Sequence, residues 1–172
     1  GAKEPRRGAL QTLVALGSLA YAGALIVPAA SYVTSVGGGG GKGKPRWIRV
    51  GRLADLPLNE PRRLQLVGDE RDAFTLTRDQ MLGSVWVIRE GAGARAMSAT
   101  CPHLGCSIDV TADKKSFGCP CHASRFAMTG ASESGPSPRG MDALEARVVD
   151  GWVEVDFRRF RQGTTDREEV GS

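Results

Sequence analysis

The hydrophobic pattern of this chain changes near residue 45. Before that point, no charged residue occurs between Gly8 and Gly41. A helix over residues 10–33 of this stretch would be roughly 36 Å long at about 1.5 Å per residue, which is enough to cross a hydrocarbon core of about 30 Å. We therefore predict a transmembrane anchor within residues 1–36.

A cleaved signal peptide is the alternative for the same segment. "PAAS" at 28–31 has the small residues of a cleavage site, although the apolar stretch is longer than such peptides usually have. Arg6 and Arg7 precede the apolar run and favour a cytoplasmic N-terminus by the positive-inside rule. The same pair also partly matches a twin-arginine export signal.

Residues 37–45, "GGGGGKGKP", follow the apolar stretch. Glycine lacks a side chain to pack and samples positive φ readily, so this composition predicts a flexible coil. We interpret it as a hinge or tether between the anchor and the following head. A plain spacer fits the composition equally well.

Residues 46–160 have short apolar runs separated by Gly, Pro and Asp. Four of these runs predict strands because they alternate or stay apolar over four to seven residues: "RWIRV", "RLQLV", "AFTLT" and "SVWVIRE". Asp150-Gly151 lies between two further runs and favours a type I′ hairpin turn. "NEPRR" at 59–63 and "TRDQMLG" at 77–83 could each form a helical turn.

These patterns together predict an all-β antiparallel sandwich or barrel head after the N-terminal helix. Residues 161–172 are polar, and we expect this tail to fray. Residues 45–172 carry 18 basic and 18 acidic groups. A neutral head argues against nucleic acid as a partner, because the excess positive charge lies near the N-terminus.

All four cysteines and both histidines of the chain fall in two short segments, "CPHLGC" at 101–106 and "CPCH" at 119–122. Each segment offers two thiols and one imidazole. One thiol and one imidazole from each would form a ligand set for a metal site, and a bridge between the remaining cysteines would lock the segments together. Two plain disulfides, a structural zinc site and a redox pair of Cys119 and Cys121 are the alternatives.

The two segments resemble those of the Rieske iron-sulfur proteins, in particular the membrane-anchored subunit of bacterial cytochrome bc-type quinol:cytochrome c oxidoreductases. The family pattern is C-x-H-L-G-C followed by C-P-C-H-x-S, and here it reads "CPHLGC" and "CPCHAS". The resemblance implies a Rieske-like fold with a small cluster-binding subdomain at about residues 96–140. It also implies one 2Fe-2S cluster per chain.

Carried over by position, the resemblance implies a role for each of these residues. Cys101 and Cys119 would hold one iron and His103 and His122 the other, while Cys106 and Cys121 would form a disulfide. Replacing two thiolates by imidazoles raises the potential of a cluster into the range of roughly −150 to +300 mV. The resemblance implies that seven further residues surround the cluster: Leu104, Gly105, Ser124, Phe126, Gly135, Pro136 and Pro138.

Three positions depart from the usual family pattern. Pro102 stands where Thr is common, and Ala123 stands where Gly is usual, so its methyl group would crowd a tight loop. Phe126 stands where many relatives have a Tyr whose hydroxyl bonds a ligand cysteine. Fewer hydrogen bonds to the sulfurs stabilise the reduced cluster less, so we expect a lowered potential, as a menaquinol donor would require.

The implied function is electron transfer as a subunit of a membrane respiratory oxidoreductase. His103 or His122 would accept an electron and a proton from quinol, with menaquinol as a candidate, and the head would pass the electron to a cytochrome c-type haem. The implied partners are a cytochrome b-type subunit and a cytochrome c-type subunit in a dimeric complex. The isolated chain would be an electron carrier.

The implied location is the bacterial cytoplasmic membrane, with a single span and with the head on the periplasmic or outer face. Two alternatives remain: the Rieske subunit of an arsenite-oxidase-like periplasmic enzyme, and a zinc-stabilised binding module on a membrane stalk. A Rieske ferredoxin is disfavoured, because such proteins generally lack counterparts of Cys106 and Cys121.

Overall fold

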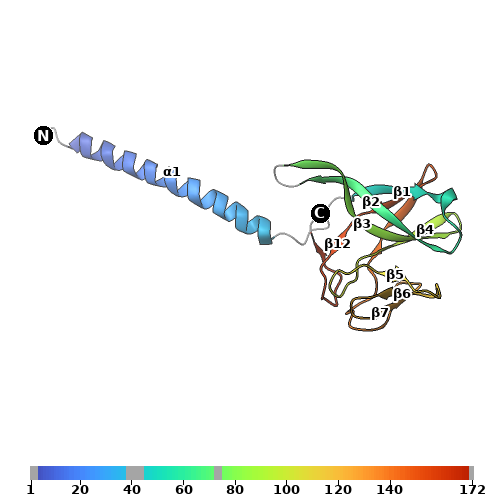
Figure 1. Ribbon diagram of the computed structural model, residues 1–172. Helices are drawn as coiled ribbons and strands as arrows, with labels where there is room; N and C mark the ends of the chain where they lie inside the picture. The colour runs from blue at the N-terminus through green and yellow to red at the C-terminus, as the bar shows by residue number, and fades with distance from the viewer. Residues whose placement is uncertain (1–3, 38–44, 72–74, 171–172) are drawn as a thin grey trace. The chain divides into compact units, whose positions relative to one another are not determined.

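A computed structural model of the chain describes residues 4–37, 45–71 and 75–170 (Figure 1). It divides into an N-terminal helical unit and a β-rich head. Most of the predicted tether, residues 38–44, lies outside the described residues, as does the start of the "AFTLT" run.

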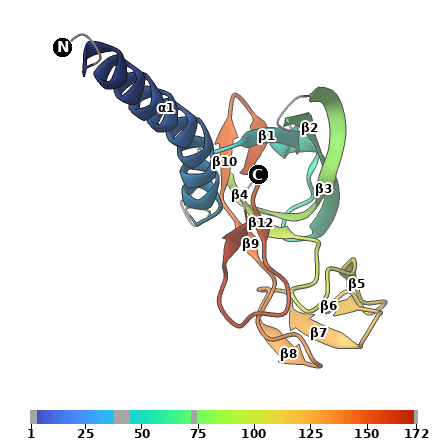
Figure 2. The same cartoon turned by 90° about the vertical axis from the view of Figure 1, so that its left-hand side faces the viewer.

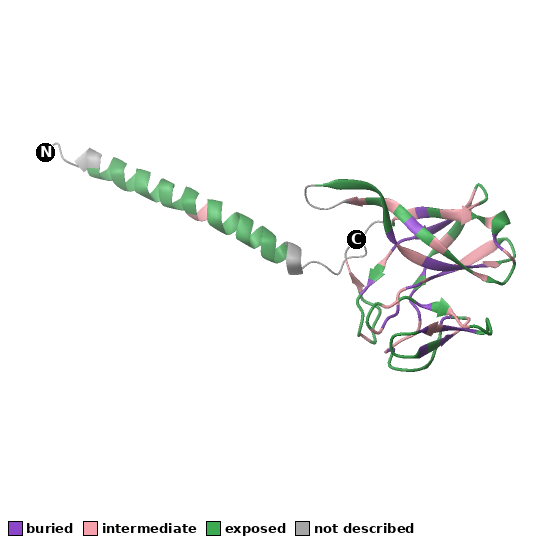
Figure 3. Ribbon diagram, viewed as in Figure 1, coloured by how far each residue is buried: buried purple, intermediate pink, exposed green. Residues whose placement is uncertain are grey.

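The helix α1 spans Glu4–Gly37, and its segment Arg7–Thr34 is long and apolar enough to cross a membrane. Its described side chains are almost all exposed (Figure 3). Several of its hydroxyl groups bond within the helix: Ser31 Oγ donates to the carbonyl of Val27 at 2.6 Å, and Thr12 Oγ1 donates to that of Gly8 at 3.0 Å. Polar groups satisfied in this way suit an apolar solvent.

Two antiparallel sheets form the part of the head that we call the base. One has the strand order β1-β11-β10 and the other β2-β3-β4-β9. Their bounds are β1 Trp47–Arg52, β2 Pro61–Arg71, β3 Leu76–Glu90, β4 Gly93–Ser98, β9 Ala143–Leu144, β10 Ala146–Val149 and β11 Trp152–Asp156. A short 3-10 turn, η1, covers Leu53–Asp55.

A third antiparallel sheet, with the order β5-β6-β7-β8, forms what we call the cluster lobe (Figure 2). Its strands are β5 Asp109–Val110, β6 Ser116–Cys119, β7 Ser124–Ala127 and β8 Ser132–Ser134. The lobe is therefore inserted between β4 and β9 of the base. The observed architecture confirms the prediction of an antiparallel β head after one N-terminal apolar helix.

The base and the lobe have separate cores. The base core is aliphatic and aromatic, and it includes Leu66, Val85, Val87, Val153 and Val155, all at most 1% exposed. The lobe core combines residues of β3 and β4, such as Trp86 and Met97, with Ile108, Phe117 and Phe126 of the lobe. Because β3 contributes alternating residues to both cores, it positions the lobe on the base.

The Asp150-Gly151 turn joins β10 and β11 as the sequence predicts. Both residues have positive φ, 51° and 77°, as a type I′ turn requires. The two predicted helical turns are wrong, however. Residues 61–63 begin β2 and residues 77–83 lie within β3, where pairing with the neighbouring strand satisfies the backbone of a segment that has weak helical signals.

The prediction that the C-terminal tail frays is also wrong for its described residues. β12, Arg159–Phe160, pairs with β13, Glu169–Val170, and the intervening loop folds back onto the head. The N–H of Gly163 donates to the carbonyl of Pro102 at 2.8 Å. Polar side chains donate hydrogen bonds to backbone carbonyls of this loop and keep it in place. A hydrophobic pattern in the sequence does not reveal such bonds.

Candidate metal centre

The first cysteine and histidine segment folds into a compact loop after β4. Thr100 and Ser107 form an isolated β-bridge that joins the two ends of the loop. Inside the loop, the N–H of Cys101 donates to the carbonyl of Cys106 at 2.7 Å, and the N–H of Gly105 donates back to the carbonyl of Cys101 at 2.9 Å. Gly105 has φ 81°, a conformation that favours glycine. The loop thus places Cys101 inside and His103 near the surface.

The second segment is the turn between β6 and β7. Cys119 and Ser124 are the last paired residues of this hairpin, so residues 120–123 form its turn. Ala123 has φ 56°, in the left-handed region. Ala123 thus adopts a backbone conformation in which a residue with a Cβ is strained, at the position where the family usually has Gly.

A disulfide between Cys106 and Cys121 connects the two loops, as predicted. Its Cα atoms are 6.6 Å apart and 15 positions apart in the sequence. The Cys119 sulfur lies within 4.8 Å of both disulfide sulfurs. This group of three sulfurs is not itself a metal site, because two of them are bonded to each other. It shows instead that the disulfide lies directly beside Cys119.

Cys101 and Cys119 are buried free cysteines, and their thiols are close enough to hydrogen-bond. Burial raises the pKa of the Cys101 thiol and the Cys119 thiol raises it further, whereas backbone N–H groups at His103 and Leu104 lower it. The imidazoles of His103 and His122 pack edge to face with their ring centroids 4.8 Å apart. His122 is exposed and His103 is partly buried.

The segment Gly135–Pro138 lies against the second loop. A Cβ on Gly135, which has φ 91°, would come within 2.5 Å of the Cα of Ser124, so only glycine fits here. The N–H of Ser137 donates to Ser124 Oγ at 3.2 Å. Ser124 is 1% exposed and accepts this bond, which leaves its own hydroxyl proton for another acceptor.

The remaining predicted site residues are divided between surface and core. Leu104 is 64% exposed beside His103, while Phe126 is completely buried in the lobe core with Cys101 and Cys119. Pro136 is exposed and Pro138 is partly buried. The structure thus brings the loops and the Gly135–Pro138 segment together around the two thiols.

The donor set fits a 2Fe-2S cluster. Two soft thiol ligands lie together inside the lobe, and two imidazoles lie together at its surface, so each kind of ligand can hold one metal of a pair. Ser124 adds a buried hydroxyl proton without an assigned acceptor among the described residues, as a sulfide ligand would need.

Sequence reasoning missed two residues that support this centre. Trp86 of β3 donates its indole N–H to the carbonyl of Ile108 at 2.9 Å and packs against Phe117 with ring centroids 5.3 Å apart. Arg139, directly after the Gly135–Pro138 segment, is nearly buried. Trp86 was visible as part of a strand, but no local pattern connects it to Ile108 or Phe117, which lie 22 and 31 positions further along the chain.

Comparison with known proteins agrees with this geometry. The Rieske 2Fe-2S domain matches residues 46–148, which is more than half of the chain. The chain belongs to the Rieske family. It therefore carries a Rieske-type 2Fe-2S cluster and is an electron-transfer protein.

The similar proteins include iron-sulfur subunits of cytochrome b6-f complexes. The cytochrome b6-f complex iron-sulfur subunit 2 of Nicotiana tabacum chloroplasts is 32% identical over 160 residues, covering 87% of this chain and 68% of the relative. Subunit 1 of Nostoc is 30% identical over 157 residues, covering 86% and 80%. Among solved structures, the Synechocystis plasma membrane Rieske protein PetC3 is 27% identical, with a TM-score of 0.46 over 64% of this chain and 99% of that one.

Proposed function

We propose that the chain oxidises a quinol and passes the electron to a cytochrome c-type haem, as the iron-sulfur subunit of a membrane oxidoreductase complex. The observation that carries this proposal is the arrangement of the centre, with two thiols buried and two imidazoles paired near the surface. The relatives named as cytochrome b6-f subunits support the membrane complex. The apolar helix α1 supports a single-pass anchor.

In this proposal Cys101 and Cys119 hold one iron, and His103 and His122 hold the other. The cluster, when bound, supplies a one-electron acceptor. The ligand thiols need no access to solvent, and burial of Cys101 and Cys119 excludes water from the sulfur side. The imidazole side has the opposite requirement, because a donor molecule must reach it.

The histidines supply the chemistry that couples the electron to a proton. An imidazole nitrogen that does not bind iron can accept a hydrogen bond from a quinol hydroxyl and then take its proton. His122 is the more exposed of the two rings and His103 the less exposed. The edge-to-face packing of the rings keeps each one oriented by the other.

A quinol needs an apolar surface as well as a base. Leu104, 64% exposed, offers such a surface next to His103. The rest of the quinol pocket would come from a cytochrome b-type subunit, and the acceptor would be a cytochrome c-type subunit. The isolated chain would then carry electrons without turning over quinol by itself.

Electron paramagnetic resonance of the reduced full-length chain in detergent tests the ligand set. A cluster with two imidazole ligands gives a reduced-state signal with a low average g value, and a zinc site gives none.

Menaquinol and ubiquinol oxidation by the chain assembled in its membrane complex then tests the function. His103→Cys and His122→Cys each keep an iron ligand but remove one imidazole proton acceptor, so at least one of them should abolish quinol oxidation. Turnover that survives in both variants would overturn the proposal.

The predicted tether has its own test. If the head moves between quinol and haem, replacing residues 37–41 by prolines should slow steady-state quinol oxidation, because prolines stiffen the chain. The resonance spectrum should stay unchanged. Equal turnover would show that these glycines are a plain spacer.

A further inference from the structure

We infer that Arg139 is a positioning residue for the cluster, acting through the C-terminal loop at residues 161–164. We call this loop the C-terminal clasp. It contacts the first cluster loop, and Arg139 fixes it to the segment that covers the second loop. The inference rests on the proposed ligand set and is independent of the identity of the electron donor.

The Arg139 side chain makes a set of charge-assisted bonds while only 10% exposed. Its Nε and Nη2 atoms form a fork on the carboxylate of Asp142, each at 2.9 Å. Nη1 donates to the carbonyl of Thr164 at 2.6 Å, and Nη2 donates to that of Arg161 at 2.9 Å. The Arg139 guanidinium is anchored on the buried carboxylate of Asp142 and therefore binds two carbonyls of the clasp at once.

The clasp reaches the first cluster loop through Gly163. Its N–H donates to the carbonyl of Pro102 at 2.8 Å, and Pro102 lies between the proposed ligands Cys101 and His103. Gly163 has φ 75°, and a Cβ at this position would lie 3.8 Å from the carbonyl of His103. The clasp thus runs directly alongside the backbone that carries both proposed ligands of this loop.

The other end of the network leads to the second loop. The carbonyl of Arg139 accepts a bond from Ser137 Oγ at 2.8 Å, and the N–H of Ser137 donates to Ser124 Oγ. The backbone carbonyl of Asp142, whose carboxylate anchors the guanidinium, accepts a hydrogen bond of 2.8 Å from the N–H of Ser98. Ser98 is the last residue of β4. Arg139 therefore connects both cluster loops and the base.

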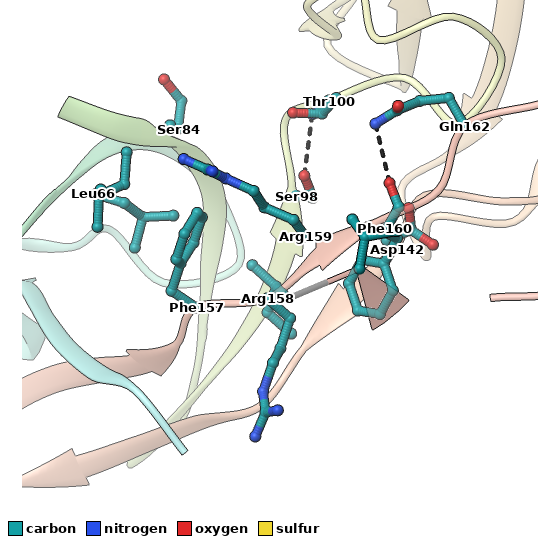
Figure 4. A pocket seen from close by; sticks show the side chains of 14 residues that line it. Leu66, Ser84, Ser98, Thr100, Asp142, Phe157, Arg158, Arg159, Phe160 and Gln162 are labelled. Atoms are coloured by element: carbon teal, nitrogen blue, oxygen red, sulfur yellow. Dashed lines mark hydrogen bonds between the residues drawn. The ribbon is translucent and has the colours of Figure 1, made fainter. Parts of the chain in front are cut away.

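The clasp does not pack closely everywhere, because a pocket lies along its start. A pocket of about 290 Å³ lies beside the start of the clasp, and its lining includes Ser98, Thr100, Phe160 and Gln162 (Figure 4). Figure 4 shows Asp142 at the same end of this pocket as Phe160 and Gln162. The hydrogen bonds of Arg139 and Gly163 connect the clasp to both cluster loops next to this pocket.

The clasp should determine how often the first loop opens. Bonds to a charged group contribute more than neutral ones, and losing two of them at a part-buried site raises the population of locally opened states. An opened loop exposes the iron ligands to solvent and lets their orientation vary. Cluster retention and the shape of the resonance signal are therefore the properties that depend on Arg139.

The decisive variant is Arg139→Lys in the full-length, cluster-loaded chain in detergent. Lysine keeps the charge beside Asp142 but cannot form the fork and reach two carbonyls at once. We expect its visible cluster absorbance to bleach at least about tenfold faster in a chelator at a temperature well below unfolding. We also expect a broadened resonance signal.

Arg167→Lys is the matched control. Arg167 lies on the same C-terminal segment, stacks on Phe160 at 4.6 Å and donates to the carbonyl of Ala143 at 2.7 Å, but these contacts lead to the base. Its bleaching rate should stay within about twofold of wild type. If Arg139→Lys does not fold, removal of residues 161–172 deletes the clasp itself together with β13 and should give the same faster bleaching.

The outcomes distinguish a wrong ligand set from a wrong role for Arg139. If the wild-type chain lacks a Rieske resonance signal, the proposed ligand set is wrong and the clasp has no cluster to position. If the wild-type chain shows the signal, and Arg139→Lys matches it in bleaching rate and line shape despite a lower unfolding temperature, Arg139 is only a structural residue. Equal bleaching of all variants would overturn the inference.

Discussion

The base and the cluster lobe are both antiparallel sheets, but they are stabilised in different ways. The base has strands as long as β2 and β3, with 11 and 15 residues, and an aliphatic core of its own. The strands of the lobe have two to four residues, and its core includes two proposed metal ligands and side chains borrowed from the base.

The difference indicates where each part obtains its stability. Short strands with a small shared core bury too little apolar surface to fold independently, so a disulfide, a metal group and hydrogen bonds must supply the rest. The base contains neither the disulfide nor a proposed metal ligand. We therefore expect changes in the lobe to alter the cluster and changes in the base to alter global stability.

The largest effect should come from Cys119→Ser. Loss of one proposed thiolate ligand should abolish the visible absorbance and the resonance signal of the cluster. The far-ultraviolet circular dichroism of the chain should change little, because the base keeps its core. A variant that retains a Rieske signal would show that Cys119 is not a ligand.

Leu66→Ala should produce the largest effect in the base. Leu66 is 1% exposed, and truncation of a buried leucine costs about 2–5 kcal/mol of unfolding free energy. Denaturant unfolding followed by circular dichroism measures this loss. Folded molecules should give a wild-type resonance signal, and a shifted signal would mean that the base and the lobe are coupled more tightly than their separate cores suggest.

Replacement of both Cys106 and Cys121 by Ser should weaken the lobe selectively. Closing a loop of this length contributes about 3 kcal/mol, chiefly by restricting the opened state. Amide hydrogen exchange should therefore accelerate in β5–β8 and stay unchanged in β2 and β3. Uniform acceleration across the head would contradict the division into two parts.

A smaller effect is expected from Glu154→Gln on the outer face of the base. Hydrogen bonds from Arg147 and then Arg49 lower the pKa of this carboxyl. A depressed folded-state pKa stabilises the protein above the unfolded-state pKa, and this contribution is lost as pH falls through the folded-state pKa. The variant should be less stable than wild type at neutral pH, with the difference shrinking on acidification in thermal unfolding scans.

Phe126→Tyr tests the lobe without removing any contact. Phe126 is fully buried beside the proposed thiolate ligands, so an added hydroxyl can donate to a ligand sulfur. Such a bond stabilises the reduced cluster, and we expect the midpoint potential to rise by roughly tens of millivolts. A redox titration with an unchanged or lower potential would refute our explanation for the missing hydroxyl.

Much of this organisation could be predicted from the sequence because its signals are local. The Asp150-Gly151 turn and the alternating runs predict strands through backbone conformation and side-chain periodicity. The two loops are recognisable because the chain places every cysteine and histidine in them. The pairing of Cys106 with Cys121 came from the resemblance to the Rieske family, and the structure contains this disulfide.

The remainder depends on contacts between distant segments. Nothing near Arg139 in the sequence indicates that Thr164 or Arg161 will lie against it. The C-terminal loop has no apolar pattern, and its order comes from carbonyl groups that every residue possesses. Residues 77–83 were misjudged because strand pairing overrides weak helical signals.

The indole of Trp86 gives the lobe an optical property. Of the three tryptophans, Trp86 alone lies in the lobe core, bonded to Ile108, whereas Trp152 and Trp47 are stacked against arginines of the base. Iron-sulfur groups absorb strongly in the near ultraviolet and quench nearby indole emission. Tryptophan emission should therefore fall as the cluster is loaded, and a Trp86→Phe variant would measure how much of this change comes from Trp86.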